Sequence, residues 1–127
     1  MIVADTHAWV WWISWRHRMS RTAMRALDEA DEIGISVISC WEVALLVARK
    51  RLDLDRDVLL WITQALEIPK VRMLELSPAV AVASTRLEWQ HDDPADRIIV
   101  ATAMAHRAPL VSKDQRIRSF RPANTIW

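Results

Sequence analysis

Short apolar runs alternate with segments of helical periodicity along the whole chain, and this alternation restricts the fold more than any other feature. The expected strands are residues 2–4, 35–38, 71–76, 110–112 and 125–127. Strands separated by helices favour a parallel sheet, because consecutive parallel strands require a long crossover connection. We therefore expect a small three-layer α/β/α fold with a central, mainly parallel sheet and helices on both faces.

Polar residues that favour helix starts precede several of the intervening segments. Ser20, Ser39, Ser77 and Asp93 each stand before a run with helical spacing, and proline follows the last two at the first helical position. The expected helices cover residues 6–15, 21–31, 39–49 and 57–66, with two more beginning at residues 78 and 94.

The length of 127 residues suits a single domain, 1–127, with one hydrophobic core. No apolar run approaches the roughly 20 residues that span a bilayer, and the first residues do not resemble a secretion signal. The single cysteine, Cys40, excludes an internal disulfide. The four histidines lack zinc-site spacing. These observations predict a cytoplasmic protein with no membrane partner.

Four carboxylates follow or closely flank the expected strand ends. Asp5 directly follows the first strand, Glu42 lies after the second, and Asp114 follows the fourth. Asp96 lies in the first turn of the helix that starts after Asp93. In open α/β sheets, sites form beyond the carboxyl ends of the strands, at a topological switch point. If the sheet is parallel, we expect all four carboxylates at one edge.

Each of these carboxylates also has a purely local explanation. Asp5 could cap the first helix, and Asp114 could cap a short helix near the C-terminus. Ser39 and Glu42 have the spacing of a capping box. Asp96 is favoured by the positive end of a helix dipole. Taken singly, none of the four carboxylates requires a functional role.

Four carboxylates crowded at one edge would repel one another unless a cation neutralises them. Oxygen ligands without cysteine or histidine suit Mg²⁺ or Mn²⁺. Carboxylate-held metal ions activate water in phosphodiester hydrolysis. In this interpretation Asp93 starts the helix while Asp96 faces the metal.

Four segments, in order, resemble the PIN-domain ribonucleases, most closely the VapC-type toxins of bacterial toxin–antitoxin pairs. They are VADTHAWVWW, ISVISCWEVALLVARKRLDL, HDDPADRIIVATAMAH and PLVSKDQRIRSF, and together they cover nearly the whole chain. This chain departs from the family in its shortage of glycine and in the basic stretch SWRHRMSR.

The resemblance implies a set of site residues. Asp5, Glu42, Asp96 and Asp114 would be the catalytic, metal-binding carboxylates. Thr6, Ser112 and Asp93 would form the supporting shell, with Asp93 mainly structural.

The resemblance also implies an activity and partners. The protein would be a Mg²⁺-dependent endoribonuclease, with Mn²⁺ as an alternative metal. It would act as a toxin neutralised by a cognate antitoxin, and it would form a homodimer.

Basic residues are clustered although the formal net charge is only +1. We name Arg16, Arg18 and Arg116 as candidate RNA contacts, since clustered arginines suit a phosphate backbone. The alternative is that these clusters are solvated helix faces.

Eight tryptophans occur in the sequence, and four of them crowd the first expected helix. Trp9 and Trp12 share one helical face, while Trp11 and Trp15 share another. Either both faces are buried within the chain, or one of them binds a protein or stacks on a base.

Three other functions are considered for a small parallel α/β chain, and the residues near Asp5 argue against two of them. A receiver domain needs an acidic pair after the first strand, and a D-x-D phosphatase needs a second aspartate near Asp5; both are missing here. The remaining alternative is a PIN-fold module that binds RNA or protein without catalysis.

Overall fold

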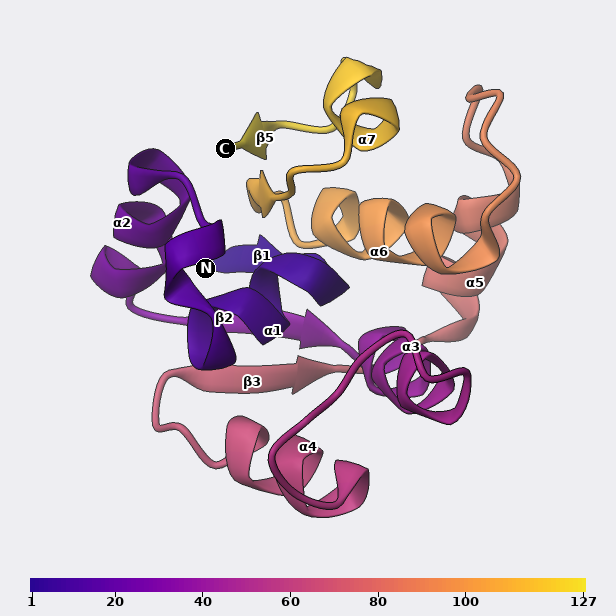
Figure 1. Cartoon of the computed structure of the whole chain (residues 1–127). Helices are drawn as coiled ribbons and strands as arrows, with labels where there is room; N and C mark the ends of the chain where they lie inside the picture. Colours follow the sequence, from indigo (N-terminus) through magenta and orange to yellow (C-terminus); the bar gives the residue numbers. More distant parts are fainter.

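The computed structural model describes all 127 residues and contains one five-stranded sheet. The strands are β1 (Ile2–Ala4), β2 (Ile33–Ser36), β3 (Val71–Leu74), β4 (Leu110–Val111) and β5 (Thr125–Ile126). Their order is β3-β2-β1-β4-β5, and every neighbouring pair is parallel (Figure 1). The predicted α/β fold with a central parallel sheet is therefore confirmed.

Seven α-helices and one 3-10 turn connect the strands. They are α1 (Thr6–Ser14), the 3-10 turn η1 (Arg16–Arg18), α2 (Arg21–Glu29), α3 (Val37–Ala48), α4 (Val58–Leu66), α5 (Pro78–Thr85), α6 (Pro94–Ala105) and α7 (Gln115–Ser119). Ser20, Asp57, Ser77 and Asp93 each accept a hydrogen bond from a backbone amide in the first turn that follows. None of the helices has the length and apolarity that crossing a bilayer demands.

Hydrophobic residues cover both faces of the sheet. Ile2 and Ala4 of β1 belong to a core formed with α1, α2 and α4. Val3, which points to the opposite face, belongs to a second core formed with α6 and the residues around α7. Helix α5 packs beside α6 (Figure 1). These two cores make the central strands inaccessible and leave the ends of the sheet for a site.

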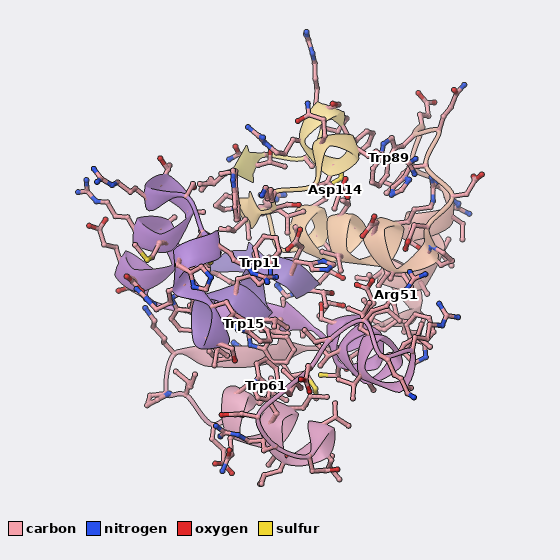
Figure 2. All side chains as sticks on the ribbon, in the orientation of Figure 1. Trp11, Trp15, Arg51, Trp61, Trp89 and Asp114 are labelled. Carbon is pink, nitrogen blue, oxygen red and sulfur yellow. The ribbon has the colours of Figure 1, made fainter.

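The tryptophans of α1 pack within the chain on both helical faces. Trp9 is fully buried and lies edge-on to Trp61, with 5.2 Å between ring centroids. Trp11, on the other face, lies 6.0 Å from the ring of Trp127. Trp15 and Trp61 line a hollow of about 450 Å³ between α1 and α4 (Figure 2). The α1 tryptophans thus contribute mainly to the fold of this chain.

The predicted boundary between the second strand and the third helix is wrong. Strand β2 ends at Ser36, and α3 begins at Val37 rather than at residue 39. The Ser36 hydroxyl accepts a hydrogen bond from the Ile38 amide, so Ser36 is the cap. Ser39 is fully buried inside α3, which removes the predicted capping box with Glu42.

The reversal of strand order falls at β1. The chain adds β2 and β3 on one side of β1 and then returns to add β4 and β5 on the other side. Ala4 pairs with Ile35 on one side and with Val111 on the other. Consequently Asp5 and Ser112 emerge at the same level, at the switch point where ligands bind in such folds.

Candidate functional site

A cavity of about 160 Å³ opens at the carboxyl edge of the sheet, and no apolar side chain lines it. Its lining residues are Asp5, Thr6, His7, Glu42, Asp93, Asp96 and Asp114. The structure therefore brings the four predicted carboxylates together, along with Thr6 and Asp93. Ser112 is buried next to the site, and its hydroxyl accepts a hydrogen bond from the Asp114 amide at 3.1 Å.

Asp5 serves as a helix cap and also lines the cavity. Its Oδ1 accepts a hydrogen bond of 2.8 Å from the Ala8 amide, which fixes the carboxylate at the start of α1. The residue is only 6% exposed. Burial raises the pKa of the Asp5 carboxyl, while the Ser112 hydroxyl and the Ala8 amide act in the opposite direction. The cap therefore orients a carboxylate that is costly to ionise.

Glu42 lies in the second turn of α3 and points to the same cavity. The Thr6 hydroxyl donates a hydrogen bond to its Oε1, and the oxygen of the Ser39 hydroxyl lies 3.0 Å from that of Thr6. Burial raises the pKa of the Glu42 carboxyl; the Thr6 hydrogen bond lowers it, and the charges of Asp96 and Asp93 raise it further. The Thr6 hydrogen bond thus holds the Glu42 carboxylate in place.

Asp96 lies in the first turn of α6 and is paired with a histidine. The Nε2 atom of His91 lies 2.6 Å from Asp96 Oδ2. Burial raises the pKa of the Asp96 carboxyl, the His91 hydrogen bond lowers it, and the charges of Asp93 and Asp114 raise it. Asp96 is therefore a partly buried carboxylate with one anchored oxygen.

Asp93 and Asp114 are exposed helix caps at the rim of the cavity. Asp93 Oδ1 accepts from the Asp96 amide at 3.1 Å, and Asp114 Oδ1 accepts from the amides of Arg116 and Ile117. One oxygen from each of Glu42, Asp93 and Asp96 lies within 4.8 Å of the others. The structure thus groups Asp93, predicted to be mainly structural, with the carboxylates of Glu42 and Asp96.

The residues of this cavity fit a hard divalent cation. All five acidic side chains offer oxygen atoms, and neither lysine nor arginine lines the cavity. Neighbouring carboxylates contribute to raising the pKa of Asp5, Glu42 and Asp96. A divalent cation would remove this repulsion, and Mg²⁺ and Mn²⁺ prefer such ligands.

The three arginines named as candidate RNA contacts do not converge. The Nη1 atom of Arg116 lies 3.4 Å from His91 Nδ1, beside the acidic cavity. Arg16 instead pairs with Asp28 at 2.6 Å, and the Arg18 guanidinium lies 5.6 Å from the centre of the Trp15 ring. Helix α1 starts at the cavity and rises about 1.5 Å per residue. Arg16 and Arg18 lie in η1, beyond the far end of this helix, and are therefore distant from the cavity.

Two histidines near the acidic residues were not identified from the sequence. His7 follows Thr6 and lines the cavity, and His91 contacts Asp96. The four histidines lack zinc-site spacing, so no metal motif marked them as candidates. The available signal was their position, since one lies two residues after Asp5 and the other two residues before Asp93.

Comparisons with known proteins agree with this architecture. Residues 2–121 match the PIN domain family. Ribonuclease VapC22 of Mycobacterium tuberculosis is 38% identical over 129 aligned residues, which cover 99% of this chain and 98% of that protein.

Two solved structures are also similar. One is a toxin–antitoxin complex from Klebsiella pneumoniae, with 20% identity and a TM-score of 0.67, covering 97% of this chain and 95% of that one. The other is VapBC2 from Rickettsia felis bound to a DNA fragment from its promoter, with 16% identity and a TM-score of 0.70, covering 98% and 97%. At these identities, the two structures establish the fold.

Proposed function

This chain belongs to the PIN-domain family, and from that membership and its acidic cavity we propose that it is a metal-dependent endoribonuclease. The observation that carries the proposal is the meeting of five carboxylates from four separate segments in one small cavity. The relative that aligns over almost the entire chain is named a ribonuclease, which supports RNA as the substrate.

The proposed metal-binding carboxylates are Glu42, Asp93 and Asp96, with Asp5 and Asp114 in the same cavity. When bound there, Mg²⁺ or Mn²⁺ supplies a Lewis acid that lowers the pKa of water and neutralises charge on the phosphodiester. In this assignment Asp93 is a ligand as well as the cap of α6.

Hydrogen bonds within the protein orient the carboxylates of the site before substrate binds. The Ala8 amide orients Asp5, Thr6 orients Glu42, and His91 holds one oxygen of Asp96. Such prior orientation lowers the cost of assembling charged ligands around a reacting group. Hydrolysis by water in this site requires no covalent intermediate on a side chain.

The direct test is cleavage of RNA by the purified protein in Mg²⁺. We expect cleavage that a chelator abolishes and that Mg²⁺ or Mn²⁺ restores. Asp96→Asn is expected to lose most of the activity while remaining folded. The control is Asp31→Asn, which is expected to keep the activity because Asp31 is exposed and does not line the cavity. Near-normal cleavage by Asp96→Asn would refute the site assignment.

A second outcome would favour the alternative function. Folded protein that binds RNA but cleaves none, in either metal, would indicate a PIN-fold binding module. Binding and cleavage must therefore be measured on the same RNA preparation.

We also propose that the protein is a cytoplasmic toxin that forms a homodimer and is neutralised by a cognate antitoxin. The similar structure from Klebsiella pneumoniae is a toxin–antitoxin complex, which supports this biological role. Expression of this chain alone is expected to arrest growth, and co-expression of a small protein encoded beside it is expected to restore growth. Arrest that persists with the Asp96→Asn variant would separate toxicity from the nuclease site.

A further inference from the structure

We propose that His91 is a positioning residue that holds the Asp96 carboxylate through a donated hydrogen bond, with Arg116 selecting the imidazole tautomer that can donate. This inference rests on the proposed metal-dependent function. The role of His91 is to orient Asp96 as a metal ligand, and it does not depend on which RNA is cut.

The imidazole of His91 is held rigidly. The residue is 5% exposed, and its ring centroid lies 4.7 Å from that of Trp89. Trp89 in turn stacks on Phe120, 4.9 Å between centroids. The Arg97 guanidinium donates to the His91 carbonyl oxygen at 3.1 Å, which fixes the backbone. A buried ring that packs against Trp89 and has a fixed backbone can orient its partner.

The two contacts of the ring determine its tautomer. Arg116 Nη1 lies 3.4 Å from Nδ1, and a guanidinium can only donate hydrogen bonds. Nδ1 must therefore accept, which places the proton of a neutral imidazole on Nε2. That Nε2–H donates to Asp96 Oδ2 at 2.6 Å. Trp89 and Arg116 line a hollow of about 560 Å³ that shares Asp93 with the acidic cavity.

This bond constrains how Asp96 can present its carboxylate. With Oδ2 engaged, Oδ1 accepts no hydrogen bond from the protein, and Asp96 still lines the cavity. Glu42 shows the same arrangement, because the Thr6 hydroxyl engages its Oε1. Hydrogen bonds to metal-ligating groups typically change metal affinity by about 10- to 100-fold when removed. His91 is thus expected to strengthen metal binding without touching the metal.

The decisive experiment is calorimetric titration of the full-length, metal-free protein with Mn²⁺. His91→Ala is expected to weaken Mn²⁺ binding about tenfold or more. His91→Gln is expected to retain most of the affinity, because its amide N–H can replace the Nε2–H donor. Wild-type affinity in His91→Ala, or equal loss in both variants, would overturn the proposal.

Nitrogen NMR of the metal-free wild-type protein tests the tautomer without metal or RNA. The imidazole resonances that vanish in His91→Gln belong to His91, and we expect a proton on Nε2 and none on Nδ1. The opposite tautomer would overturn the proposal even if His91→Ala failed to fold.

Two arginine variants test the contribution of Arg116. Arg116→Ala and Arg118→Ala remove the same charge from the same short helix, but only Arg116 contacts His91. Arg116→Ala alone should shift the His91 Nδ1 resonance; equal shifts, or none, would remove Arg116 from the proposal.

The outcomes distinguish this inference from the proposed function. If the wild type binds no Mn²⁺, the metal-dependent function fails, while the NMR result still reports the His91–Asp96 contact. If the wild type binds Mn²⁺ and His91→Ala binds it equally well, only the role of His91 fails.

Discussion

Asp5 shows how one carboxylate can have a structural and a chemical role at the same time. A capping aspartate is often not considered a functional candidate, because its hydrogen bond to the helix already accounts for the choice of residue. Here the cap is what directs the side chain, since the bond from the Ala8 amide holds Asp5 at the edge of the cavity. The local explanation and the functional one are therefore compatible, and two substitutions can separate them.

Asp5→Asn and Asp5→Ala should both lose RNA cleavage, but they should differ in stability. Asparagine caps helices about as well as aspartate, so Asp5→Asn keeps the cap and removes the charge. Asp5→Ala removes both and should lower the free energy of unfolding by about 0.5–2 kcal/mol. Urea unfolding and RNA cleavage measure the two effects, and full activity in either variant would exclude Asp5 from the site.

The raised carboxyl pKa values predict a pH dependence of stability in the metal-free protein. The pKa of Asp96 is raised in the folded state, so the folded protein binds more protons than the unfolded chain above the ordinary value near 4. The free energy of unfolding should therefore fall as pH rises from the ordinary pKa through the raised one. Below the ordinary pKa this destabilising contribution is absent.

Comparison with Asp96→Asn isolates the contribution of this carboxyl to the pH dependence. Asparagine can still accept from His91 through its amide oxygen, but it does not titrate. Urea unfolding with a chelator present should show a smaller decline with pH for Asp96→Asn than for the wild type. Parallel curves would contradict the assigned direction of the pKa shift.

At the level of elements, the second strand and third helix show why sequence patterns misplace boundaries. Val37 and Ile38 continue an apolar, β-branched run, which predicts strand. In the structure the Ser36 hydroxyl caps a helix at this point, and Ile38 packs against the core beneath α6 and α7. Tertiary burial favours the helix over the local strand propensity. The change moves Glu42 into the second turn of α3.

The only glycine of the chain lies where β2 and β3 pack closely. A Cβ atom at Gly34 would lie 2.5 Å from Leu74 Cδ1 and 3.2 Å from Met1 Sδ. Leu74 is buried, so it has little room to move. We expect Gly34→Ala to lower the free energy of unfolding by about 1–3 kcal/mol.

A double-mutant cycle with Leu74→Val tests that explanation. The shorter side chain should relieve the clash, so the double variant should be more stable than the sum of the single changes predicts. Urea unfolding gives all three free energies. Strict additivity would place the cost of Gly34→Ala somewhere other than Leu74.

At the level of the whole molecule, the parallel topology brings together acidic residues that lie far apart in the sequence. The acidic residues of the cavity lie as much as 109 positions apart (Asp5 to Asp114), yet β1 and β4 are neighbours. Strand periodicity and cap residues were sufficient to predict the sheet and this collection of carboxylates. They could not predict the His91–Asp96 contact, because it depends on how the residues before α6 pack against Trp89 and Phe120.

Crowding these carboxylates should couple metal binding to global stability. A ligand that binds only the folded state adds about 2.7 kcal/mol when it is present at about 100 times its dissociation constant. Increasing Mg²⁺ or Mn²⁺ should therefore raise the thermal unfolding midpoint of the wild type. Asp96→Asn should show a smaller rise or none, while Asp31→Asn should follow the wild type. Na⁺ at matched ionic strength controls for screening. An equal rise in Asp96→Asn would mean that the stabilising metal binds outside this cavity.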